Sequence, residues 1–167
     1  QRGRSWSVSR KRFAKNTDCR DYTPLRRFAF GIAFHMAGSD NVTKPLTILI
    51  TGASAGIGRI TCERLAKQKH RFVLAARSVD KLATLESQLR SMGCECLSVP
   101  TDVSDPSAIE RLVKAAVERF GRIDVLVNNA GIECFSSFDE LPVDQILQTI
   151  ETNLTGAILL TRFVVPV

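Results

Sequence analysis

The stretch TGASAGIG at residues 51–58 constrains the fold more than any other part of the chain. It follows the apolar run 46–50 and leads into an amphipathic segment, an order that predicts a strand, a glycine turn and a helix. Its glycines, Gly52, Gly56 and Gly58, let the backbone turn tightly and approach a pyrophosphate, which the unpaired N–H groups of the helix start would bind. These features predict a dinucleotide phosphate site, although the spacing is not that of the standard GxGxxG fingerprint. No GK[ST] follows, which excludes a nucleotide-triphosphatase loop.

Short apolar runs alternate with helical repeats along the rest of the body. The first helix is expected to end near Lys67, and an apolar repeat at 143–158 predicts a last helix. Short runs that are apolar throughout are typical of parallel strands covered by helices on both faces, so the predicted fold class is α/β with a doubly wound parallel sheet. The expected strands are 46–50, 72–76, 96–99 and 123–127, and the helices between them carry apolar residues at 82, 85 and 89 and at 108, 112, 115, 116 and 120.

Arg77 follows the second strand, at an edge of the sheet where doubly wound folds bind their ligands. Folds that select NAD usually place a carboxylate here for the ribose 2′-hydroxyl, and this chain has Ala76-Arg77-Ser78 instead. A guanidinium suits a 2′-phosphate, although a solvated surface arginine also explains the residue.

Polar residues also follow the third and fourth strands. Asp102 comes directly after the third strand, where its carboxylate can accept a hydrogen bond from an adenine amine. Helix capping is the alternative role, but Ser104 and Asp105 already supply candidate caps. The fourth strand ends in NNAG at 128–131, whose side-chain amides can bind a ligand or neighbouring backbone, and simple turn chemistry also explains this tetrapeptide.

Taken together, these motifs resemble the classical short-chain dehydrogenase/reductase family over residues 46–167. TGASAGIG fits its TGxxxGxG turn, Asp102-Val103 its adenine-side acid, NNAG its fourth-strand signature, and ETNLTG at 151–156 its helix signature. The resemblance implies a Rossmann-type sheet with strand order 3-2-1-4, and a nicotinamide dinucleotide as cofactor.

The resemblance also implies a role for each matching residue. Arg77 becomes the clamp of NADP, because the NAD-selecting acid of the family would fall at Ala76, so a preference for NADPH is expected. Asn153 matches the helix asparagine that helps to hold a water in the proton relay behind the catalytic tyrosine and lysine. Lys69 stands where the family usually has a left-handed glycine after the first helix. The expected cofactor-binding residues are Thr51, Gly52, Ser54, Ala55, Gly56, Ile57, Gly58, Arg77, Asp102, Val103, Asn129, Ala130 and Gly131.

The family's catalytic Ser and Tyr-x-x-x-Lys should follow Asn153, and they do not occur within the 167 residues. The one tyrosine, Tyr22, has Arg26 four places on. We therefore expect a fragment of an NADP-dependent oxidoreductase, which transfers hydride between nicotinamide and a small carbonyl or alcohol substrate, and which binds the dinucleotide here without turnover. A non-catalytic dinucleotide-binding module is the alternative. A Rossmann methyltransferase is disfavoured, because its ribose-binding acid after the second strand is absent.

Positive charge is concentrated at the start of the chain. Residues 1–35 hold nine Lys and Arg against two Asp, a net charge of +7, so a chain of net charge +6 leaves −1 for the remainder. These charges show no helix or strand periodicity, which argues against nucleic-acid binding. We expect residues 1–35 to be a basic leader outside the fold, either upstream sequence before a domain start near Met36 or an organellar transit peptide, and residues 36–167 to be an incomplete NAD(P)-binding domain.

The remaining composition favours a cytoplasmic protein without metal or membrane span. Five cysteines are irregularly spaced and lack paired CxxC groups, so reduced thiols are expected, with Cys94 and Cys96 on one face of a strand. No apolar stretch is long and uninterrupted enough to span a bilayer. The family likeness implies a homo-oligomer for the full-length protein.

Overall fold

The computed structural model describes residues 44–134 and 136–167. The predicted leader, the predicted domain start near Met36 and Tyr22 lie outside these residues, and the predicted domain division therefore stays a prediction. Within the described residues the strands are β1 (Thr47–Thr51), β2 (Arg71–Ala76), β3 (Glu95–Pro100) and β4 (Val125–Val127). They form one parallel sheet in the order β3-β2-β1-β4, which confirms the predicted α/β fold class and strand order.

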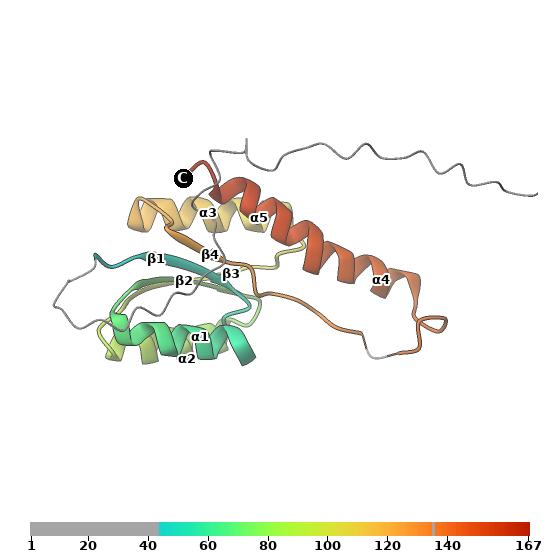
Figure 1. The fold of residues 1–167 in the computed structure, drawn as a ribbon, viewed down its shortest axis with the longest axis horizontal. Coiled ribbons are helices and arrows are strands. Elements are labelled where there is room, and N and C mark those ends of the chain that lie inside the picture. Colours follow the sequence, from blue (N-terminus) through green and yellow to red (C-terminus); the bar gives the residue numbers. More distant parts are fainter. Residues whose placement is uncertain (1–43, 135) are drawn as a thin grey trace, which may run out of the picture. The chain divides into compact units, whose positions relative to one another are not determined.

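Helices cover both faces of this sheet (Figure 1). The pairs α1 with α2 and α3 with α5 lie on opposite faces, and α4 extends beyond the sheet, with no buried residue of its own (Figure 1). The bounds are α1 (Gly56–Leu65), a 3-10 turn η1 (Ala66–Gln68), α2 (Val79–Ser91), α3 (Pro106–Phe120), α4 (Val143–Ile150), a π turn η2 (Glu151–Thr155) and α5 (Gly156–Val164).

Alternate residues of the central strands point into two separate cores. Ile48 and Phe72 belong to the core beneath α1 and α2, whereas Leu49 and Val73 belong to the core beneath α3 and α5. All four are at most 2% exposed. Successive strand side chains point to opposite faces, so a sheet covered on both faces needs strands that are apolar throughout, as the sequence indicated.

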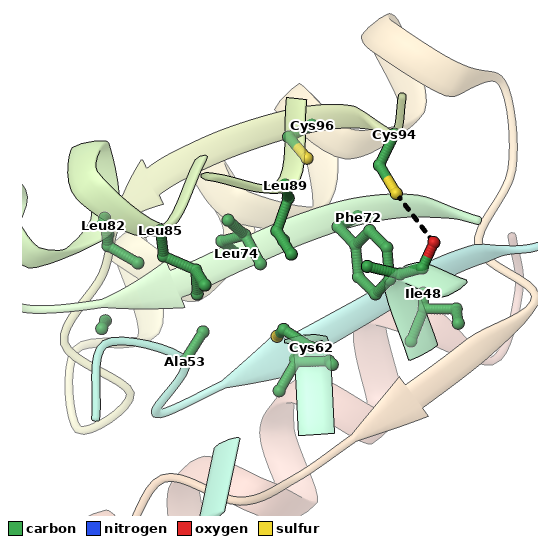
Figure 2. Close-up of a cluster of buried hydrophobic side chains, with 13 residues drawn as sticks. Ile48, Ala53, Cys62, Phe72, Leu74, Leu82, Leu85, Leu89, Cys94 and Cys96 are labelled. Atoms are coloured by element: carbon green, nitrogen blue, oxygen red, sulfur yellow. Dashed lines mark hydrogen bonds between the residues drawn. The ribbon is translucent and has the colours of Figure 1, made fainter. Parts of the chain in front are cut away.

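Three cysteines contribute to the core beneath α1 and α2 (Figure 2). Cys94 and Cys96 lie in the same core, as their alternation predicted, and the Cys94 thiol donates to the Ala66 carbonyl oxygen at 3.4 Å. Burial raises the pKa of Cys62 and of Cys96 to about 12. These thiols are free, and such high pKa values keep them in the unreactive protonated form.

The helix ends follow from local residues. Asp105 caps α3 by accepting a hydrogen bond from the Ser107 N–H at 2.9 Å, with Pro106 in the first helical position. After η1, Lys69 adopts the left-handed conformation with φ 54°, and it is the one non-glycine residue with positive φ in the described part of the chain. The expectation that Lys69 occupies a glycine-type position is therefore confirmed.

His70 sits almost fully buried just before β2, 5% exposed. Its Nδ1 accepts from the Leu46 N–H at 3.3 Å, and its Nε2 lies 3.0 Å from Gln68 Oε1. This pairing requires the proton on Nε2, and burial lowers the pKa of the ring. The neutral imidazole is therefore the form that fits the fold.

The sequence predicted one last helix at 143–158, whereas the structure has two helices, α4 and α5, separated by a π turn. Residues 151–155 form a π turn between α4 and α5. A π turn holds about one extra residue per turn, so side chains after it point in other directions than in an uninterrupted α-helix. Of the described residues, no helix is long and apolar enough to cross a membrane.

Candidate functional site

A cavity of about 650 Å³ opens at the carboxyl ends of the strands. Each of the four strands contributes the residues that follow it, as the doubly wound plan requires. The lining residues are Gly52, Ser54, Ala55, Gly56, Ile57, Ala75, Ala76, Arg77, Ser78, Lys81, Thr101, Asp102, Val103, Asn129, Ala130, Gly131, Ile132 and Thr152.

The glycine turn needs its glycines for space as well as for conformation. Gly52 has φ +65°, and a Cβ there would lie 2.7 Å from Asn129 Nδ2. A Cβ on Gly58 would overlap the Gly52 carbonyl oxygen, so α1 packs directly on the turn. No side chain caps the start of α1, which leaves its first N–H groups beside the cavity for an anionic ligand.

Thr51 and Gly58 lie behind the cavity wall, whereas the other eleven predicted cofactor-binding residues line the cavity. Thr51 is 1% exposed, and its Oγ1 accepts hydrogen bonds from the Asn129 and Ala130 N–H groups, both at 3.0 Å. Asn129 Nδ2 in turn donates to the Thr51 carbonyl oxygen at 3.0 Å and to the Gly52 carbonyl oxygen at 3.3 Å. Thr51 therefore joins the ends of β1 and β4 and holds two walls of the cavity in register.

The edge of the cavity after β2 is positively charged. Arg77, Ser78 and Lys81 line it together, and Ala76 supplies no carboxylate. Arg77 is exposed and lies close enough to Asp102 for its charge to act on that carboxyl. The geometry therefore places a guanidinium where a fold that selects NAD would place an acid.

Asp102 lies on the cavity wall, and Ser104 holds its carboxylate in place. Its Oδ1 accepts from the Ser104 N–H at 2.9 Å and from the Ser104 hydroxyl at 2.7 Å. These hydrogen bonds lower the pKa of the Asp102 carboxyl, and the charge of Arg77 lowers it further. Because Asp105 caps the following helix, the capping role considered for Asp102 belongs to Asp105, and Asp102 is left as an ionised acceptor on the cavity wall.

Asn153 lies in the π turn and does not line the cavity. Its Oδ1 accepts from the Ile132 N–H and its Nδ2 donates to the Ile132 carbonyl oxygen, both at 2.8 Å. The side chain thus fixes the backbone just after NNAG, and the neighbouring Thr152 reaches the cavity instead. The proton-relay role of Asn153 stays a prediction.

Gly156 brings α5 against the loop that carries the adenine-side acid. A Cβ on Gly156 would overlap the Val103 carbonyl oxygen and lie 3.2 Å from the Val103 Cβ. Val103 is buried and lines the cavity, so a larger residue at 156 would displace that wall.

Sequence reasoning missed several lining residues, of which Lys81, Ile132 and Thr152 carry side chains of functional interest. Lys81 is four places after Arg77 at a helix start, a spacing that could have indicated a second cation. Thr152 is the neighbour of Asn153, lies in the π turn and lines the cavity. Of the described residues, no group of three or more His, Cys, Asp or Glu is arranged to hold a metal ion.

The family of the chain follows from sequence comparison. The family model described as short chain dehydrogenase matches residues 46–167. The chain belongs to the short-chain dehydrogenase family. The glycine turn, Asp102 and NNAG that the sequence singled out all fall within the matched part of this short-chain dehydrogenase.

Similar proteins of known name are dehydrogenases and reductases. L-rhamnose 1-dehydrogenase (NAD(P)(+)) of Azotobacter vinelandii is 42% identical over 115 residues, which cover 66% of this chain and 45% of that protein. The alcohol dehydrogenase of the archaeon Thermococcus sibiricus, solved with 5-hydroxy-NADP, matches with a TM-score of 0.72 and 35% identity over 74% of this chain and 53% of that one. An actinorhodin polyketide ketoreductase variant, solved with NADPH, matches with a TM-score of 0.69 and 41% identity over 72% and 46% of the two chains. This short-chain dehydrogenase spans about half the length of the curated relatives it matches.

Proposed function

We propose that the chain is the cofactor-binding part of an NADP-dependent short-chain oxidoreductase. The observation that carries the cofactor preference is Arg77 on the cavity wall beside Ala76, where no carboxylate is present to select NAD. Relatives that use NAD(P) or were solved with NADPH support a nicotinamide dinucleotide, and the preference for NADPH rests on Arg77 itself.

The residues around the cavity fit such a cofactor. Gly52 and Gly58 leave a cradle that any Cβ would fill, and the uncapped start of α1 supplies N–H donors for the pyrophosphate. Asp102 would accept from the adenine amine, and the backbone at 129–131 would form the wall beside the adenosine. Thr51 and Gly58 would act from behind by holding these walls in position.

The reaction proposed for the whole protein is hydride transfer between the nicotinamide of the cofactor and a carbonyl or alcohol carbon. Asn153 would support the proton relay through the backbone it fixes at Ile132. The relatives named above act on a sugar, an alcohol and a polyketide, so the substrate class proposed here is a small carbonyl or alcohol compound. Residues 1–167 hold no Tyr-x-x-x-Lys, so we expect this chain by itself to bind the cofactor without carbonyl reduction.

Isothermal titration with NADPH and with NADH tests the cofactor assignment. The wild-type chain should bind NADPH more tightly, and Arg77→Ala should lose most of that preference, because charge-assisted contacts to phosphate are strong. Tighter binding of NADH by the wild type, or an unchanged preference in Arg77→Ala, would overturn it. Oxidation of NADPH by the chain with a carbonyl substrate would contradict the proposed lack of turnover.

A non-catalytic dinucleotide-binding module is the second candidate, favoured by the absence of the catalytic tyrosine and lysine from these 167 residues. The coding sequence after Val167 separates the two. An encoded Ser and Tyr-x-x-x-Lys supports the oxidoreductase, and a stop codon supports the module.

The full-length protein is proposed to be a cytoplasmic homo-oligomer. Exposed apolar side chains support the assembly, since Leu147 in α4, Leu154 in the π turn and Ile158 in α5 are all more than half exposed. The free buried thiols fit a reducing compartment. Light scattering of the full-length protein tests the assembly, and a monomer at every concentration would contradict it.

A further inference from the structure

Lys81 lines the cavity together with Arg77, although nothing in the family motifs points to it. It is the third residue of α2, and Arg77 and Ser78 stand immediately before that helix. Three residues of the lining carry a charge, namely Arg77, Lys81 and Asp102. Both cations therefore line the edge of the cavity after β2.

Among the described residues, the Lys81 side chain forms no hydrogen bond. Its neighbours on the helix surface, three and four residues away, are Arg77, Ser78, Thr84 and Leu85, none of them acidic. In the described part of the chain it forms no ion pair. Other helical cations do have acidic partners one turn away, as in Arg59 with Glu63 at 3.0 Å, Arg90 with Glu86 at 2.5 Å and Lys114 with Glu118 at 3.9 Å.

The position of Lys81 is also unfavourable for a cation in the absence of an anion. It lies in the first turn of α2, where the positive end of the helix dipole repels it, and Arg77 adds a like charge. Asp80 is the nearest acid in sequence, but it does not line the cavity. An anion between Arg77 and Lys81 would relieve both repulsions.

We propose that Lys81 is a specificity-determining residue that binds, together with Arg77, the 2′-phosphate of NADP. This inference rests on the proposed function, since it assigns a second cation to the same cofactor site. A dianionic phosphate offers enough oxygen acceptors for a guanidinium and an ammonium at once. NADH lacks this group, so Lys81 should contribute to NADPH binding and not to NADH binding.

The experiment measures dissociation constants for NADPH and NADH by isothermal titration of the whole chain and four variants. The variants are Lys81→Ala, Arg77→Ala, the double variant, and Lys114→Ala as a control that removes an exposed helical lysine distant in sequence from the cavity residues. Lys81→Ala should weaken NADPH binding about three- to fivefold, the range of an exposed ionic contact, and should change NADH binding less than about twofold. The double variant should bind NADPH more weakly than Arg77→Ala.

The outcomes separate this inference from the proposed function. If the wild type prefers NADPH and Arg77→Ala removes the preference, while Lys81→Ala matches Lys114→Ala, the role of Lys81 is overturned and the proposed function stands. If the wild type binds NADH at least as tightly as NADPH, the proposed function falls as well.

Higher salt should reduce the NADPH preference of the wild type more than that of Lys81→Ala, because salt screens an exposed charge contact. Equal salt dependence of the two proteins would count against the role of Lys81. Because Lys81 is exposed, its variant should keep the wild-type melting curve.

Discussion

Replacing Thr51 by valine should destabilise the fold, whereas the same replacement at Thr47 should not. Both threonines lie on β1 and are at most 1% exposed. The Thr51 hydroxyl accepts two backbone hydrogen bonds, from Asn129 and Ala130, and lies 3.4 Å from the Val127 carbonyl oxygen. The Thr47 hydroxyl has no hydrogen-bond partner among the described residues.

The expected loss in free energy of unfolding follows from the N–H groups that Thr51→Val leaves without an acceptor. Thr51→Val removes the acceptor of two N–H groups, and each buried donor without a partner costs about 1 to 3 kcal/mol. Asn129 and Ala130 are half-buried, so water replaces part of the loss, and we expect about 2 kcal/mol in total. Thr47→Val removes a buried hydroxyl that bonds to nothing, so its free energy of unfolding should stay the same or rise by about 1 kcal/mol.

Urea unfolding followed by far-ultraviolet circular dichroism measures both changes, since the one tryptophan, Trp6, lies outside the described residues. The matched pair has the same change in shape and polarity, so it isolates the hydrogen bonds. Equal destabilisation by the two variants, or none in Thr51→Val, would refute the role given to Thr51.

Three further predictions concern single residues. Lys69→Gly should raise the free energy of unfolding by up to about 1 kcal/mol in urea unfolding, because φ 54° strains a side chain, whereas Lys67→Gly in the preceding right-handed turn should lower it. The free energy of unfolding should fall as the pH drops below about 6.5, because the pKa of His70 is lower in the folded chain and the unfolded chain therefore binds the proton more tightly. His70→Asn keeps a hydrogen-bond acceptor but does not titrate, so unfolding curves of this variant should show a weaker dependence on pH. Gly156→Ala should weaken NADPH binding roughly tenfold by pushing Val103 from the cavity wall, and an affinity like the wild type's would contradict the close packing there.

Much of the fold could be predicted because each local signal agreed with the global plan. The run at 72–76 is short and apolar throughout, as a strand between two helical layers requires, and β2 is flanked by strands and covered on both sides. The glycines of the turn indicated a close approach of backbone segments, and in the structure Gly52 and Gly58 have no room for a Cβ.

The rest depends on contacts that sequence spacing does not encode. The apolar residues at 143–158 do not signal the π turn, so the sequence could not predict it. Only the structure shows that Asn153 bonds to the Ile132 backbone and that Thr152 lines the cavity. The spacing of Lys81 four residues after Arg77 could have indicated a second cation, but the sequence does not show that both side chains line one cavity.

The most direct measurement of the central claim is an NMR titration of the isotope-labelled chain with NADPH. We expect the largest amide shifts in the turn at 52–58, at Arg77 and at Asp102. The amides of α3 should change little, because its buried residues pack in the core beneath α3 and α5 and none of its residues lines the cavity. Shifts confined to residues outside the cavity, or no saturable shifts at all, would contradict the assignment of this cavity as the dinucleotide site.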